Sequence, residues 1–590
     1  MTSKSQSVLK IRLPVWRARL LVTLMFLGFM ALAARAILVQ FVYKDFLQAE
    51  AEKRYSSKAE LVATRGMITD RNGKPLATSP AVKTVTVNPT YYKKVLAELE
   101  ESQSEQLSGL PGKLVRLSDL LDIDLNTIER RLAQKRQEVT LKRQIDPRLA
   151  KEVMSLNIPG VSFKTEYKRF YPSVEATAHL IGFTGIDHKG LEGLEFSYQK
   201  VLAGKPGSRQ VNRDRKNQII ETVATISEVE DGEELALSID RELQHVAFSA
   251  LENTAIEHAA KSASIVVLDV RTGEVLALAN WPSYNPNNRS TYTPELYRNG
   301  AIVNQFEFGS TLKPFTIAAA LEGKFVTPKT LIDIEDGRLR IGGRTISDDH
   351  PEDDSLLSVT QVIQRSSNVG TIKIAKRMPS LDLWTVLSNA GFGKKPTLRF
   401  PGVASGKLTA PEKWTEVKHA SISFGYGISA SLLQLARAYT IFARDGVLIP
   451  LTLERRTEVA EGEQVVSKHT ARKVLKMLET VTHENGTGIG AAIPGYRVAG
   501  KTGTAKVAFG GSYARGKYRS SFVGIAPVSN PRFIVAVMVD EPSSGSYYAS
   551  TVAAPVFRKV MEETLTRLGV DPDNLIIERE AKREILPGPV

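Results

Sequence analysis

The segment IVVLDVRTGEVLAL, residues 265–278, decides the fold of the larger part of this chain. Two apolar runs flank Arg271-Thr272-Gly273, a polar turn that ends in glycine, and this pattern predicts a β-hairpin. Further strands are predicted near the C-terminus, at residues 498–506, 522–526 and 533–539. Helical patterns fall between these two groups of strands. The sequence therefore predicts an α+β domain in which helices flank a mainly antiparallel sheet.

Helices and a second domain are predicted around this core. Asp240 precedes an amphipathic run at 243–256, and a helix at 555–568 is expected to end at Gly569. A charged stretch at 213–216 and an acidic turn at 228–232 indicate a domain boundary. We place an elongated domain at 60–222, the larger domain at 223–570 and a loose tail at 571–590. Within the first domain, Asn72-Gly73 predicts a tight turn, and residues 112–156 are expected to be helical.

The N-terminus has the pattern of a membrane anchor. Residues 1–19 carry five basic side chains and no acidic one, and residues 20–43 are apolar apart from Arg35 and Gln40. About 20 apolar residues cross a bilayer, so we predict a transmembrane helix at 20–43 with a cytoplasmic tail at 1–19. A stalk at 44–59 would follow. A cleaved signal peptide is the rival, but the apolar run resumes after Arg35, which favours retention.

Composition excludes several kinds of site. The 590 residues include no cysteine, so disulfides and thiolate zinc sites are impossible. The eight histidines are scattered singly, and we expect neither a metal nor another cofactor. The net charge is +14, but basic and acidic residues are interspersed outside the N-terminus, so nucleic-acid binding is not predicted.

Three short motifs occur in order along the larger domain: Ser310-Thr-Leu-Lys313, Ser366-Ser-Asn368 and Lys501-Thr-Gly-Thr504. Ser-x-x-Lys recurs at 7–10 and 197–200, and Ser-x-Asn recurs at 155–157 and 283–285. Lys-Thr-Gly occurs only once. The ordered set, more than any single motif, indicates a serine acyl-transfer site in which lysine is the base.

Ser310 and Lys313 form the first catalytic pair of this hypothesis. A helix is expected to begin at Ser310 and to end at Gly323, with Pro314 in its first turn. Lys313 would share a helix face with Ser310 and could take its proton only when neutral. Burial and the charge of Lys501 are expected to lower the Lys313 pKa. Ser-x-x-Lys alone would also fit a serine that caps a helix and a solvent-exposed lysine.

The other two motifs supply the proton relay and the substrate contacts of the predicted acyl-transfer site. Ser366 can relay a proton, and Asn368 can hold a substrate amide. Lys501 to Thr504 are predicted to form a strand in which Thr502 and Thr504 share one face. These two threonines would bind a substrate carboxylate, the Thr504 backbone N–H would help to form an oxyanion hole, and Gly503 would leave room for the substrate.

With these residues the chain resembles a class B penicillin-binding protein, of the division-specific (septal, FtsI-type) peptidoglycan D,D-transpeptidases. The resemblance extends to 65–73, to Arg169-Phe-Tyr-Pro172 with His179-Leu-Ile-Gly182, and to 190–195, which correspond to the family's pedestal motifs. Residues 425–436 are similar to those of the division type. Phe308 is a departure, because the family commonly has proline at this position.

The resemblance implies a 60–222 pedestal (dimerisation-type) domain and a 223–570 penicillin-binding/β-lactamase-like transpeptidase domain. It implies a serine-type D-Ala-D-Ala transpeptidase that cross-links peptidoglycan stem peptides and is acylated by β-lactam antibiotics. It also implies a location in the inner membrane at the division site, where the enzyme works with a glycan-polymerising partner and other division proteins. The alternatives are an elongation-type class B transpeptidase, a β-lactamase or β-lactam sensor, and a non-catalytic septal scaffold.

Overall fold

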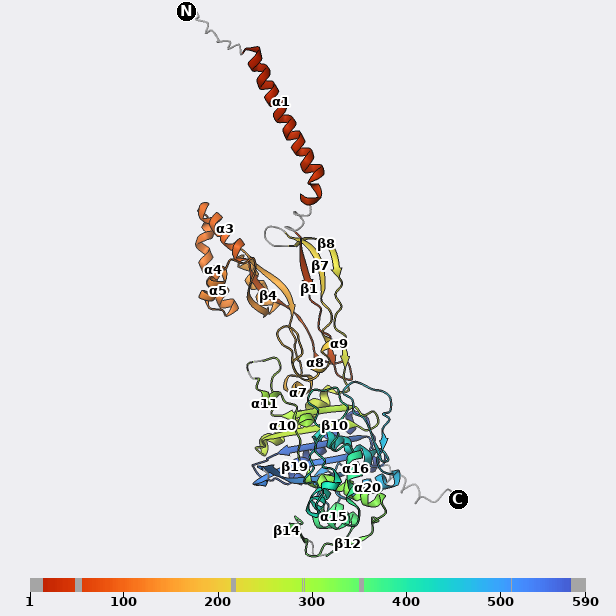
Figure 1. The fold of residues 1–590 in the computed structure, drawn as a ribbon. Helices are drawn as coiled ribbons and strands as arrows, with labels where there is room; N and C mark the ends of the chain where they lie inside the picture. Colours follow the sequence, from red (N-terminus) through yellow and green to blue (C-terminus); the bar gives the residue numbers. More distant parts are fainter. Residues whose placement is uncertain are drawn as a thin grey trace, which may run out of the picture.

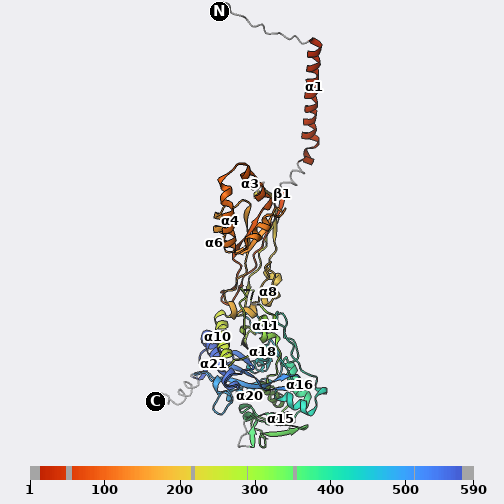
Figure 2. The same cartoon turned by 90° about the vertical axis from the view of Figure 1, so that its left-hand side faces the viewer.

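The computed structural model describes residues 14–47, 56–213, 219–288, 290, 292–349, 355–510 and 512–574. Figure 1 shows a long pedestal that stands on a larger globular domain, and Figure 2 shows the same two parts from the side. Residues 1–13 of the predicted cytoplasmic tail, 48–55 of the stalk and 575–590 of the loose tail lie outside the described residues.

The N-terminal helix agrees with the predicted anchor. Helix α1 (Val15–Ile37) continues directly into a π-helical turn, η1 (Leu38–Val42). Together they form 28 residues that are long and apolar enough to cross a membrane. None of the residues in α1 is buried against the rest of the protein.

Three sheets build the described part of the pedestal. In one, β7 (Gly207–Arg213) pairs with β1 (Ser56–Leu61) and β8 (Ile219–Ser227). Residues 56–59, which were expected in the stalk, therefore belong to the pedestal. The expected boundary at 222/223 is also wrong, since it would cut through β8. The chain leaves the pedestal only after β9 (Leu235–Ala236), which pairs in parallel with β2 (Ile68–Thr69).

The second pedestal sheet carries a small helical layer. Its strands are β5 (Val139–Ile145), β4 (Ala81–Val87) and β6 (Val161–Tyr167), and its helices are α3 (Pro89–Glu101), α4 (Glu105–Leu121), α5 (Leu125–Leu132) and α6 (Pro147–Ser155). The helical prediction for 112–156 is interrupted by β5, whose register is set by pairing with distant β4. The predicted turn at Asn72-Gly73 is confirmed, because it joins β2 to β3 (Pro75–Ala77) and Gly73 has φ of +78°.

An antiparallel five-stranded sheet forms the centre of the larger domain. The strand order is β11 (Val275–Trp281), β10 (Ser262–Asp269), β20 (Phe533–Asp540), β19 (Ser512–Ala526) and β18 (Ala499–Phe509). The 265–278 hairpin and the α+β prediction are confirmed. Alternate residues of β10 face two separate cores: Ile265 and Val267 pack in one, and Val266 and Leu268 in the other.

Helices cover both faces of this sheet. Helix α10 (Arg241–Glu257), which contains the predicted run at 243–256 and is capped by Asp240, packs with α21 (Ala549–Arg567) on one face. Helix α21 begins six residues before the predicted Pro555, because Val552 and Ala553 in its first turns are buried against the sheet. The other face carries α13 (Lys313–Glu322), α18 (Leu432–Ala438) and α20 (Lys468–Thr480). A helical region with α14 (Val359–Gln364), α15 (Asn368–Ala375), α16 (Ser380–Asn389) and α17 (Glu416–Ser423) completes the domain.

Candidate active site

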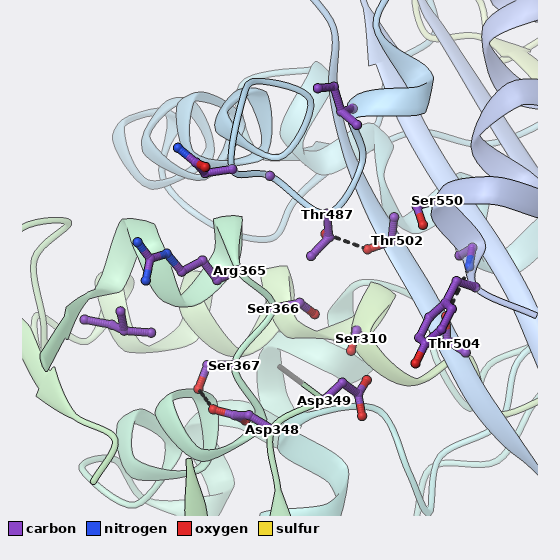
Figure 3. Close-up of a pocket in the computed structure, with 16 residues that line it drawn as sticks. Ser310, Asp348, Asp349, Arg365, Ser366, Ser367, Thr487, Thr502, Thr504 and Ser550 are labelled. Carbon is purple, nitrogen blue, oxygen red and sulfur yellow. Dashed lines mark hydrogen bonds between the residues drawn. The ribbon is translucent and has the colours of Figure 1, made fainter. Parts of the chain in front are cut away.

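Ser310 lies in a 3₁₀ turn, Gly309–Leu312, which leads directly into α13. The helix thus begins at Lys313, three residues later than expected, and ends before Gly323 as predicted. Ser310 makes no capping hydrogen bond in this turn. It lines a cavity of about 410 Å³ instead (Figure 3). Among the described residues no hydrogen bond engages its hydroxyl, so the hydroxyl is available to a ligand.

Tight backbone contacts hold the Ser310 turn in place. Gly309 has φ of +54°, and its N–H donates to the Gly425 carbonyl at 3.2 Å. A Cβ on Gly425 would lie 2.0 Å from the Gly309 oxygen. A Cβ on Gly503 would likewise lie 2.6 Å from the Phe308 oxygen. Gly503 therefore makes room for the protein's own turn, which corrects the expectation that it makes room for substrate.

The two motif lysines meet at Ser366. The Lys501 amine donates to the Ser366 hydroxyl at 2.8 Å, and the Lys313 amine lies 3.2 Å from the same oxygen and also donates to the Ser366 carbonyl. Both lysines are fully buried. In the part of the chain that the structure describes, Lys313 makes no hydrogen bond to Ser310. Ser366 is thus the group that physically links the three motifs.

Ser366 holds this position in a strained backbone conformation. Its φ of +61° places a non-glycine residue in the left-handed region, at a cost of roughly 1–3 kcal/mol. The residue follows α14, whose N-terminus carries a Ser358–Gln361 capping box. The left-handed turn lets both the carbonyl and the hydroxyl of Ser366 face the buried lysines. Such strain is typical of functional sites.

Burial sets the protonation of the lysine pair. It lowers the pKa of Lys313 to about 8, while the carboxylates of Asp348 and Asp349 act in the opposite direction. Burial also lowers the pKa of Lys501 well below its ordinary value, and the charge of Lys313 lowers it further. The expected direction for Lys313 is confirmed, but its expected cause was partly wrong, since the repulsion acts on Lys501. Burial therefore shifts both amines toward their neutral forms.

Thr502 and Thr504 project from β18, the edge strand, into the same cavity as Ser310 (Figure 3). Thr502 shares a hydrogen bond of 2.7 Å with Thr487, and the Thr504 hydroxyl accepts from the backbone N–H of Ala549 at 3.2 Å. Because the Thr504 oxygen accepts this bond, its own hydrogen remains available to a carboxylate. The predicted alternation of faces along this strand is confirmed.

Asn368 does not line the cavity. Its side-chain amide donates to the Ser347 carbonyl at 2.9 Å, and its backbone N–H donates to the Asp348 carboxylate at 2.5 Å. Asp348 also accepts from the Ser367 hydroxyl at 2.6 Å and so occupies the N-terminus of α15. A role of Asn368 in holding a substrate amide stays a prediction, and in this structure its side-chain amide is held by Ser347.

Sequence reasoning missed several residues that line the cavity. Asp349, Thr487, Tyr548 and Ser550 come from loops and a helix start outside the motifs, and Arg365 directly precedes Ser366. Thr487 had a usable signal, since it lies in a polar loop between Gly486 and Gly488 before the motif strand. The positions of the other four depend on tertiary packing.

Comparisons with known proteins agree with this geometry. Residues 263–562 match the family described as the penicillin binding protein transpeptidase domain, and residues 60–237 match the penicillin-binding protein dimerisation domain. The probable peptidoglycan D,D-transpeptidase PbpC of Pseudomonas aeruginosa is 38% identical over 561 residues, 95% of this chain and 96% of that protein.

Two further proteins extend the likeness. The peptidoglycan D,D-transpeptidase FtsI of Escherichia coli K12 is 38% identical over 563 residues, 95% of this chain and 93% of that protein. The crystal structure of penicillin binding protein 3 of Mycobacterium tuberculosis, complexed with aztreonam, is 25% identical and has a TM-score of 0.66. The match covers 87% of this chain and 98% of the Mycobacterium tuberculosis chain.

Proposed function

Because the chain belongs to the class B penicillin-binding proteins, in which a dimerisation domain precedes a transpeptidase domain, we propose that it cross-links peptidoglycan stem peptides through an acyl-enzyme on Ser310. The observation that carries this proposal is the contact of Lys313 and Lys501 with the Ser366 hydroxyl beside the cavity that Ser310 lines. It places a hydroxyl that can relay a proton and two buried amines beside the cavity that Ser310 lines.

The donor half of the reaction follows from this arrangement. Neutral Lys313 accepts the Ser310 proton as the hydroxyl oxygen attacks the carbonyl carbon of the D-Ala–D-Ala bond. The C–N bond then breaks, and a proton passes through Ser366 to the amine of the departing D-alanine. Thr502 and Thr504 hold the terminal carboxylate, with Lys501 behind them. The oxyanion hole is assigned to the backbone N–H groups of Ser310 and Thr504.

The acceptor half regenerates the enzyme. The side-chain amine of a second stem attacks the ester carbonyl, the bond to the Ser310 oxygen breaks, and the proton lost by the amine returns to that oxygen. One amide is broken and one is formed, so no cofactor is consumed. Capture by water instead of the amine would be carboxypeptidase activity. β-Lactams resemble the donor and would acylate the same serine.

The setting of this reaction is part of the proposal. The apolar helical segment Val15–Val42 would anchor the chain in the inner membrane, with its basic N-terminus in the cytoplasm and the catalytic domain outside. The FtsI name of the E. coli relative favours the division site over elongation. A glycan-polymerising partner and other division proteins would deliver the strands that are joined.

A thioester analogue of the donor with a D-amino acid acceptor tests this function in the purified full-length protein. We expect the transfer product, its increase with acceptor concentration, and its loss in Ser310→Ala. Rapid turnover of penicillin with no transfer product would indicate a β-lactamase instead. Full support of division in cells by Ser310→Ala would indicate a scaffold.

A further inference from the structure

Asp349 carries a carboxylate in the catalytic cavity to which the acylation steps give no role. It lines the same cavity as Ser310, and the residue is exposed to solvent. Figure 3 shows its carboxylate next to Ser310. Within the described ranges, this carboxylate forms neither an ion pair nor a hydrogen bond. A site that binds the terminal carboxylate of the donor therefore also carries an unpaired negative charge beside its nucleophile.

The preceding aspartate, Asp348, differs because the fold already uses its charge. Its carboxylate accepts from the Ser367 hydroxyl at 2.6 Å and from the backbone N–H groups of Asn368 and Val369 at 2.5 and 3.0 Å. These contacts hold Asp348 at the N-terminus of α15, where a negative charge is stabilising. Of the two adjacent aspartates, only Asp349 is therefore available to a ligand in the cavity.

The cations of the site do not cancel the Asp349 charge. Burial lowers the pKa of Lys313 and of Lys501, and the Asp349 charge acts in the opposite direction on both, so its field reaches the two amines. Because burial shifts these amines toward their neutral forms, they are weak counter-charges. Arg365 is the one cation among the described residues that line the cavity, and Figure 3 shows it beyond Ser366, away from Asp349. The space beside Ser310 is therefore negative.

We propose that Asp349 binds the ammonium group of the acceptor stem and holds it against the acyl-enzyme, an inference that rests on the proposed transpeptidase function. The donor does not fit this role, because its terminal carboxylate is repelled by Asp349. The acceptor amine is the cation of the reaction, since an alkyl amine is protonated at neutral pH. A carboxylate accepts strong, charge-assisted hydrogen bonds from such a group.

This contact decides which nucleophile captures the acyl-enzyme. The bound ammonium releases one proton to solvent, and the neutral amine attacks the ester carbonyl carbon. Its nitrogen becomes positively charged as the C–N bond forms, and Asp349 stabilises that charge. The bond to the Ser310 oxygen then breaks, and the second proton passes from the nitrogen to that oxygen. Water arrives uncharged, so Asp349 gives it no advantage in binding, and cross-linking is favoured over hydrolysis.

The ratio of transfer product to hydrolysis product tests the proposal. The full-length protein in detergent is acylated with the thioester donor, and a synthetic stem peptide with a free side-chain amine is the acceptor. Asp349→Asn should lower the ratio about 10- to 100-fold, because a charge-assisted hydrogen bond is lost. Asp349→Glu, which keeps the charge, should retain most of the ratio. With hydroxylamine, a nucleophile that is uncharged at neutral pH, Asp349→Asn should change the ratio little.

A matched variant separates contact from a general effect of charge. Glu484 is exposed and directly precedes Asn485, which lines the cavity, but Glu484 does not line it. Glu484→Gln removes the same charge and should leave the ratio unchanged. An unchanged ratio in Asp349→Asn, equal losses in both variants, or an equal loss with hydroxylamine would refute the role of Asp349. Failure of the proposed function itself would differ, because the parent protein would then not be acylated.

Discussion

The lowered pKa of Lys313 predicts how acylation depends on pH. With a pKa of about 8 in place of 10.5, the neutral fraction of this amine at pH 7 rises from about 0.03% to about 9%, a gain of roughly 300-fold. Raising the pH increases the neutral form, so the second-order rate constant for acylation by penicillin should rise about tenfold from pH 7 to pH 9 and then level off. Lys313→Arg, which remains charged, should reduce this rate by at least 100-fold.

Stopped-flow measurement with a fluorescent penicillin provides the assay, and native unfolding midpoints at each pH provide the control for stability. A lysine with an ordinary pKa would give a rise of about 100-fold over the same interval without levelling. That result, or a rate that does not change with pH, would refute the role of burial in preparing Lys313. Retention of the parental rate by Lys313→Arg would refute its role as base.

Substitutions at Ser366, Gly503 and Asp349 test other parts of the site. Ser366→Ala and Ser366→Gly should both reduce acylation by about 10²- to 10³-fold, but the glycine variant should unfold at the higher temperature, because only glycine is unstrained at this φ. Gly503→Ala should lower stability by about 1–3 kcal/mol and slow acylation by pushing on the Phe308 carbonyl, whereas Gly109→Ala, with open space around it, should do neither. Asp349→Asn removes a charge that raises the pKa of Lys313 and should therefore move the acylation curve to lower pH; no displacement in the pH profile would contradict that electrostatic contact.

Much of the catalytic domain could be predicted from local sequence pattern. The 265–278 hairpin, the helix after Asp240 and the alternation of Thr502 and Thr504 each depend on residues close in sequence, and the structure has all three. The order of the motifs predicted that Lys313, Ser366 and Lys501 lie in one site. No local pattern could have predicted their contacts, because Ser366 and Lys501 are more than 100 positions apart.

Other features depend on packing that no local pattern records. Residues 56–59 look like part of a stalk in sequence, but they pair with β7 in the structure. Pro555 resembles a helix start, but burial of the preceding turn extends α21 past it. The Ser347 carbonyl that accepts from the Asn368 amide lies 21 residues earlier in the chain, and no local pattern predicts this contact. Gly503 faces Phe308, and only the folded turn shows that contact.

Mass spectrometry of the penicillin-labelled protein tests the central claim most directly. The full-length protein is incubated with a β-lactam, digested, and searched for the modified peptide. We predict a single covalent adduct whose fragments place the added mass on Ser310, and no adduct in Ser310→Ala. An adduct on another residue, or a stable adduct that survives in Ser310→Ala, would contradict the assignment of Ser310 as the nucleophile.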